Sequence, residues 1–150
     1  MTTKLFKFKY QLLLACLLFA FQNFAQTYTP PSQERVSQLI DQINECKSNI
    51  NELEERINYM EENASAYTLA QYNEVKALLN DSKKCKNAIK KELESIRKDY
   101  PGWFNSPNAT MSIRSHGFTS PRELQELLSE IQQKIDDLLD GFDDLVKPEH

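Results

Sequence analysis

The chain predicts an all-α protein, an antiparallel three-helix bundle in which a coiled-coil hairpin packs against a third helix. Only three of its 150 residues are glycine, and Glu, Lys, Gln, Leu and Ile recur throughout, a composition that favours helix because these side chains lose little rotamer freedom there. Apolar residues follow a spacing of three and four in three long stretches, as on one face of a helix. The first two stretches also carry one cysteine each, Cys46 and Cys85. This length is typical of a single domain.

The first 25 residues are typical of an export signal. Lys4, Lys7 and Lys9 precede an apolar run over 12–21, which has the length of a signal-peptide core and is too short to span a bilayer. We expect cleavage after Ala25, which leaves an extended leader over 26–31 and a helical bundle over 32–146. The mature protein is therefore expected outside the cytoplasm, in a periplasm or the extracellular space.

Two alternatives to cleavage after Ala25 stay open. The tetrapeptide ending in Cys16 resembles a lipoprotein signal, and the same segment left uncleaved would anchor the chain in a membrane. The apolar run continues past Cys16, which favours cleavage and no stable membrane insertion afterwards. Loss of the signal leaves 15 basic and 22 acidic residues, a net charge of −7. Such an acidic protein is a poor partner for nucleic acid or anionic lipid.

The first helix is expected over 33–62. Two prolines keep the leader extended, and Ser32 is a suitable N-cap. The apolar positions form a heptad seam of about four repeats, as in a coiled coil. These positions are Val36, Leu39, Ile43, Cys46, Ile50, Leu53, Ile57 and Met60.

The second helix is expected over 68–99. Thr68 and Gln71 have the spacing of a capping box, and Pro101 with Gly102 ends the helix. Its apolar face thins at Ser82. The positions expected to be buried are Tyr72, Val75, Leu78, Leu79, Cys85, Ile89, Leu93, Ile96 and Tyr100.

Cys46 and Cys85 predict a disulfide across this helical hairpin. The midpoint between them falls in the small-residue break over 63–66, so two helices folded back at the break bring both sulfurs to the same height. An even number of cysteines in an oxidising compartment favours a bridge. Closing a loop of about 40 residues contributes on the order of 4 kcal/mol in the chain-entropy account. The alternative is a pair of unpaired buried thiols.

The segment over 101–119 has no periodicity and is expected to be a long loop. Loops of this length are often functional, so its side chains are candidates for binding a partner. The interpretation that we favour is that Trp103 and Phe104 fold back and cap the end of the bundle, with a partner-binding loop as the main alternative. The candidate partner-binding residues are Trp103, Phe104, Arg114, His116 and Phe118.

The third helix has the clearest start signal of the chain. Ser120 is the expected N-cap, Pro121 occupies the first helical position and Glu123 completes a capping box. The helix is expected over 121–140, or to 146 if Gly141 does not end it. Its apolar positions are Leu124, Leu128, Ile131, Ile135, Leu138, Phe142 and Leu145.

Charge predicts how the helices pack. The stretches 33–63, 65–100 and 120–150 carry net charges of −5, +3 and −6, so a basic second helix in contact with both acidic ones is complementary. The alternative is that its lysines form an exposed basic stripe for an acidic partner. That stripe comprises Lys83, Lys84, Lys86, Lys90 and Lys91.

No catalytic, cofactor or metal site is expected. His116 lies near Ser115 and Ser120, but nothing in the loop supplies the third group that orients a catalytic base. The acidic run over 136–144 fails as a calcium loop, because Leu138 and Lys147 occupy ligand positions. Two histidines and two mature cysteines make no transition-metal set.

These features favour a non-enzymatic, exported helical interaction module. We expect an accessory subunit, adaptor or spacer that binds another protein, with homo-oligomerisation through the heptad seams as a further option. The alternatives are a periplasmic chaperone and an inhibitor or immunity-like protein, and after them a small hydrolase around His116. Exposed apolar side chains at Tyr67, Tyr100 and Phe104 would favour the chaperone.

Overall fold

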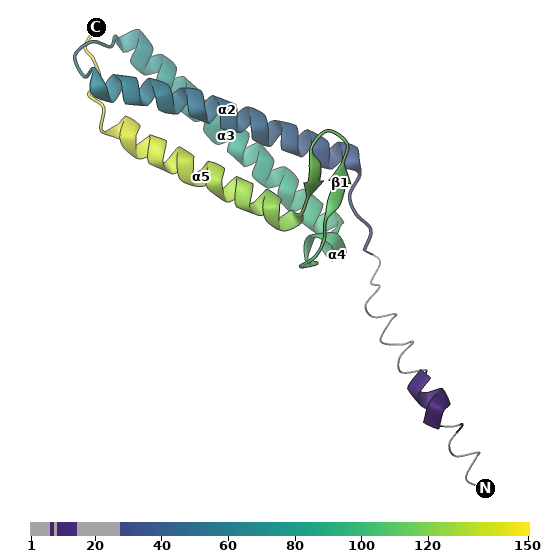
Figure 1. Ribbon diagram of the computed structural model, residues 1–150. Helices are drawn as coiled ribbons and strands as arrows, with labels where there is room; N and C mark the ends of the chain where they lie inside the picture. The colour runs from purple at the N-terminus through teal and green to yellow at the C-terminus, as the bar shows by residue number, and fades with distance from the viewer. Residues whose placement is uncertain (1–6, 8, 15–27) are drawn as a thin grey trace.

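A computed structural model of the chain describes residues 7, 9–14 and 28–150 (Figure 1). The expected cleavage site after Ala25 and the alternative lipidation site Cys16 lie outside the described residues. Within the signal segment, Leu12, Leu13 and Leu14 are 56–64 % exposed and take no part in the hydrophobic core. No helix among the described residues is both long and apolar enough to cross a bilayer.

Three long helices form the bundle that the sequence predicts: α2 over Gln33–Glu62, α3 over Leu69–Asp99 and α5 over Pro121–Asp143. Each packs against the other two (Figure 1). Ion pairs join the start of α2 to the end of α3 and the end of α2 to the start of α3, so these two helices are antiparallel. The pairs between α2 and α5 advance in the same direction along both helices, so α5 is parallel to α2.

The predicted caps begin all three helices. Ser32 accepts a hydrogen bond from the backbone N–H of Arg35, and Ser120 accepts one from that of Glu123. Thr68 and Gln71 form the complete reciprocal capping box. These bonds satisfy backbone donors that have no partner within the helix.

The heptad seam of α2 is the centre of the core, and all eight predicted positions are at most 2 % exposed. On α3, five of the predicted residues are buried, whereas Tyr72, Leu78, Cys85 and Tyr100 are only partly buried. Ser82, where the apolar pattern thins, is 3 % exposed. A small side chain therefore continues the seam there in place of an apolar one.

Helix α5 continues through Gly141 and ends at Asp143, between the two expected limits. A Cβ atom at Gly141 would lie 3.0 Å from Oε1 of Glu61 and 3.5 Å from a methyl group of Ile57. The glycine thus permits a close approach of α5 to α2 and does not act as a helix stop.

The expectation of a long loop over 101–119 is wrong. The segment forms the short helix α4 over Pro101–Phe104 and an antiparallel hairpin of β1, Met111–Ile113, with β2, Gly117–Thr119. Gly117, at φ 77°, supplies the left-handed conformation after the turn. Strands of three residues are too short to show a periodicity in sequence, which is why the pattern missed them.

Trp103 is fully buried at the end of the bundle, together with Ala109, Met111 and Ile113 of the following segment. Phe104 is partly buried against the same core. The structure therefore supports the capping alternative for Trp103. Because the indole N–H has no hydrogen-bond partner, this burial depends on apolar packing alone.

Replacement of Trp103 by Ala should destabilise the protein by about 3–5 kcal/mol, because it leaves a cavity under the hairpin. Urea denaturation followed by circular dichroism measures the change. Phe118→Ala is the matched control, since this ring is 75 % exposed and its loss should change the unfolding free energy by less than about 0.5 kcal/mol. Equal costs for the two variants would contradict the assignment of Trp103 to the core.

Candidate functional site

The candidate partner-binding residues divide between core and surface. Trp103 is buried and Phe104 partly buried, whereas Arg114 and Phe118 are exposed and His116 is intermediate. The structure therefore does not bring these five side chains into one cluster. They lie at one end of the bundle, which we call the hairpin end: the first turn of α2, the last turn of α3, α4, the hairpin and the start of α5 (Figure 1).

The hairpin is attached to α2 along its inner side. Met111 and Ile113 are buried in the core, and the hydroxyl groups of Ser37 and Ser115 are 3.3 Å apart. On the outer side, Phe118 pairs across the strands with Ser112, and both are exposed. The hairpin thus presents an aromatic ring to solvent from a base that is packed against the bundle.

His116 contacts an acid that sequence reasoning missed. Its Nε2 lies 3.0 Å from Oδ1 of Asp41 on α2, although the angle is not that of a hydrogen bond. The two residues are far apart in sequence, so only the fold joins them. Among the described residues no hydrogen bond connects His116 to a serine, so the nucleophile–base contact of a hydrolase is not formed here.

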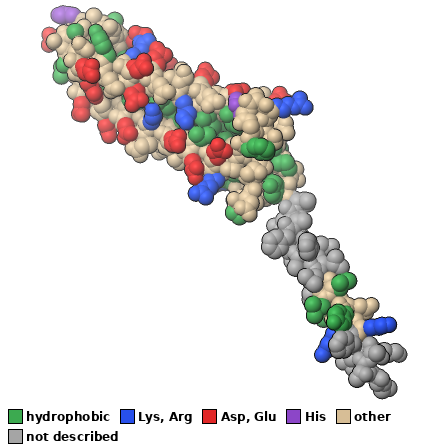
Figure 2. All heavy atoms as spheres, viewed as in Figure 1, with side chains coloured by type: hydrophobic (Ala, Val, Ile, Leu, Met, Phe, Trp, Pro, Cys, Tyr) green, Lys and Arg blue, Asp and Glu red, His purple; other side chains and the backbone are tan. Residues whose placement is uncertain are grey.

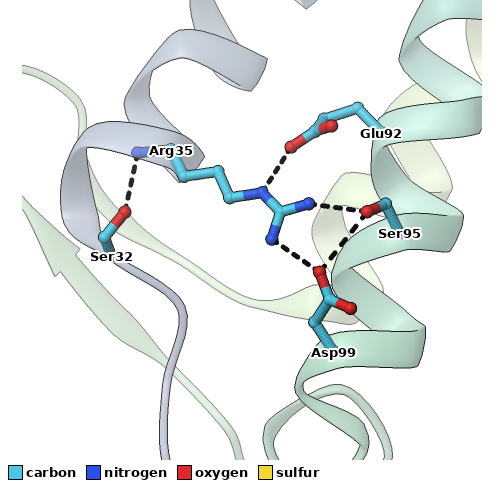
Figure 3. Close-up of polar contacts among 5 residues, drawn as sticks. All are labelled: Ser32, Arg35, Glu92, Ser95 and Asp99. Carbon is cyan, nitrogen blue, oxygen red and sulfur yellow. Dashed lines mark hydrogen bonds and ion pairs between the residues drawn. The ribbon is translucent and has the colours of Figure 1, made fainter.

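Arg35 joins the first turn of α2 to the last turns of α3 (Figure 3). Its guanidinium donates to Glu92 at 2.5 Å, to Ser95 at 2.7 Å and to Asp99 at 3.0 Å, and lies 6.0 Å from the ring centroid of Tyr100. Hydrogen bonds to Glu92 and then Asp99 raise the pKa of Arg35 far above its usual value. We call these residues the Arg35 cluster; its multiple charged hydrogen bonds position α2 against α3.

Cys46 and Cys85 lie side by side between α2 and α3, and both are free thiols in the structure. Burial and then the hydrogen bond with Cys85 raise the pKa of the Cys46 thiol to about 12. Cys46 is therefore protonated at neutral pH and is a poor nucleophile. Cys85 is partly exposed, and its sulfur is the one that an oxidant reaches first. The disulfide between them stays a prediction.

The cations of α3 do not form the ion pairs with the acidic helices that the sequence predicts. The helix does contact both acidic helices, but the cations of the ion pairs between helices come from α2 and α5: Arg35, Arg56, Lys47 and Lys134. Lys84 pairs only with Asp81 of its own helix. Within the part of the chain that the structure describes, the remaining cations of α3 form no ion pair. These are Lys76, Lys83, Lys86, Lys90, Lys91, Arg97 and Lys98.

An open groove of about 320 Å³ lies between α3 and α5 at the hairpin end, and we call it the α3–α5 groove. Leu93, Leu128 and Phe104 are its apolar side chains and are buried or partly buried. Its polar residues are exposed at the rim. They are Lys90, Glu94, Arg97, Gln125 and Ser129.

Within residues 7, 9–14 and 28–150, no group of three or more His, Cys, Asp or Glu side chains is arranged to bind a metal ion. No family model matches the chain, and no curated protein or solved structure shows significant similarity to it.

Replacement of Arg35 by Met should reduce stability by about 2 kcal/mol, because it leaves two partly buried acceptors on α3, Glu92 and Ser95, without their charged donor. Thermal and urea denaturation measure this change. Arg122→Met is the matched control, since Arg122 is 85 % exposed and pairs with Glu126 within one helix, an interaction of about 0.3–0.5 kcal/mol. A cost for Arg35→Met no larger than that of the control would contradict the role of the cluster.

Peptide mapping without reductant should find Cys46 linked to Cys85 in protein purified from its export compartment. The two thiols lose two electrons and two protons to a disulfide donor there. Cys85→Ser should then have an unfolding free energy lower than that of the oxidised parent by on the order of 4 kcal/mol. The difference between the variant and the fully reduced parent should be much smaller. Alkylation of both cysteines in the untreated folded protein would exclude the bridge.

Proposed function

We propose that this protein is an exported, non-enzymatic interaction module that binds another protein through its hairpin end, as an accessory subunit, adaptor or spacer. One observation carries the proposal: Phe118 is 75 % exposed on a hairpin that is itself packed against α2. Aromatic side chains are enriched at the centres of protein interfaces. A ring on a pre-organised base also loses little conformational entropy on binding.

The surface around Phe118 supports this proposal. Figure 2 shows hydrophobic side chains at the hairpin end and also at the opposite end of the bundle, with acidic side chains along its length. Arg114 is exposed in the turn of the same hairpin. Aromatic and arginine side chains are both enriched among the residues that contribute most to binding at protein interfaces.

A chaperone is the second candidate. It would require exposed apolar side chains at Tyr67, Tyr100 and Phe104, and these three side chains are buried or partly buried. Tyr67 is 6 % exposed and its hydroxyl donates to the carbonyl oxygen of Val146 at 2.5 Å. Tyr100 is partly buried beside Arg35, and Phe104 is partly buried on the core. These three side chains do not supply the broad exposed apolar surface that a client-holding chaperone needs, which supports a dedicated partner over many clients.

The export component rests on the N-terminal sequence. Three lysines before a short apolar run, ending at a small residue, are typical of a cleaved signal. In the described part of that segment, Leu12, Leu13 and Leu14 do not join the core, as is expected of residues that the mature fold does not need.

The test is site-specific photo-crosslinking in the producing cells. A photoreactive phenylalanine analogue at position 118 should yield one discrete adduct, which mass spectrometry of the envelope and secreted fractions identifies. The same analogue at Tyr59 is the matched control, since that ring is 54 % exposed but lies near the other end of α2. No adduct at 118 would contradict binding through the hairpin, and a ladder of many adducts would favour the chaperone.

A further inference from the structure

We propose that the α3–α5 groove binds an acidic amphipathic helix of the partner protein. This inference rests on the proposed function, since it adds a second contact surface at the same end of the bundle. It names the chemistry of the occupant: apolar side chains on one face of the helix, with carboxylates beside them.

Two grooves along α5 differ in size and in the ion pairs that span them. Between α2 and α5, the pairs Lys47–Glu130 and Lys134–Glu54 span the gap at 3.3 Å each, and the space beside them is only about 40 Å³. No ion pair among the described residues spans α3 and α5 at the hairpin end, and the groove there is about 320 Å³. Paired charges thus close the α2–α5 seam, whereas the α3–α5 seam is open at the hairpin end.

The rim of the groove carries unpaired positive charge. Lys90 and Arg97 are seven residues apart, two helical turns or about 10 Å along α3, and neither forms an ion pair with another described residue. The groove residues opposite them on α5, Gln125 and Ser129, are neutral. Glu94 is the one carboxylate of the rim, so the lining keeps a net positive charge. An acidic occupant would supply the missing counter-charges.

The apolar side chains of the groove come from three different elements. Leu93 of α3 is 5 % exposed and forms the floor, whereas Leu128 of α5 and Phe104 of α4 are partly buried against the core. The exposed parts of Leu128 and Phe104 provide a preformed apolar strip over Leu93. A third helix laid along such a strip inserts side chains at i, i+3 or i+4, and i+7. Carboxylates seven residues apart on its flank match the spacing of Lys90 and Arg97.

The experiment uses the processed protein and a synthetic helical peptide of about 18 residues, with Leu at the i, i+3, i+4 and i+7 positions and Glu on both flanks. A peptide with Lys in place of every Glu is the charge control. Fluorescence anisotropy measures affinity, and methyl NMR shifts of Leu93 and Leu128 locate the site. We expect saturable binding of the acidic peptide only, weakened by added salt. Equal binding of both peptides, or no shift at the two leucines, would overturn the proposal.

Charge reversal on α3 has a matched control on the same helix. Lys90→Glu with Arg97→Glu should weaken binding about tenfold or more, because both rim cations become repulsive. Lys91→Glu with Lys98→Glu has the same spacing and the same net charge change, and these two side chains are exposed and unpaired but do not line the groove. Equal losses for the two double variants would show attraction to overall charge and overturn the assigned site.

A third variant blocks the groove by a substitution at its exposed rim, outside the hydrophobic core. Ser129→Glu places a carboxylate on the rim opposite α3, as Glu130 lies opposite Lys47 on the other seam. It should abolish peptide binding while leaving the unfolding free energy unchanged or higher. Gln133→Glu, exposed one turn further along α5, should leave binding intact. Unchanged binding to Ser129→Glu would overturn the proposal.

These outcomes are separable from those of the proposed function. A discrete adduct at position 118 together with a peptide that does not bind would overturn the groove and leave the interaction module standing. Peptide binding without an adduct would support the groove and contradict the role of the hairpin. Self-association that is lost on Lys90→Glu with Arg97→Glu would identify a second copy as the occupant and overturn the assignment to a different protein.

Discussion

The burial of the α2 heptad seam is the constraint on which the rest of the structure depends. Eight apolar positions over 30 residues are at most 2 % exposed, and both other long helices pack against this one strip. The face of α2 opposite this strip stays exposed to solvent. Polar residues beside the strip form the ion pairs that join α2 to α3 and to α5.

The three helix–helix contacts of the bundle differ in the ion pairs that span them. On α2, Arg35 and Arg56 lie on the flank that faces α3 and find acids there. Apart from Lys84, which pairs with Asp81 of its own helix, the cations of α3 form no ion pair within the described part of the chain. Net charge per helix did not predict the ion pairs, since two of them join the acidic helices α2 and α5, whereas none among the described residues joins the basic α3 to α5. The position of each charge on its helix decided which pairs form, and the α3–α5 groove stays open because no pair spans it.

Most of the scaffold was predictable from local patterns. Caps at Ser32, Thr68 and Ser120 and the three-four spacing located the three long helices to within a few residues, because both signals act within one or two turns. The hairpin was missed, since three-residue strands have no periodicity to detect. The candidate site was only partly predictable: Phe118 and Arg114 are exposed as a binding surface requires, whereas Trp103 belongs to the core and Asp41 contacts His116 from a distant part of the chain.

By itself, the sequence determined the helix boundaries, the core face of each helix and the adjacency of Cys46 and Cys85, because heptad spacing and a symmetric break specify register along a folded hairpin. Only the tertiary structure decided which surfaces stay free. The α3–α5 groove combines side chains of α3, α4 and α5, and the exposure of Phe118 depends on which side of the hairpin packs against α2. Both are contacts between distant segments, and no local pattern encodes them.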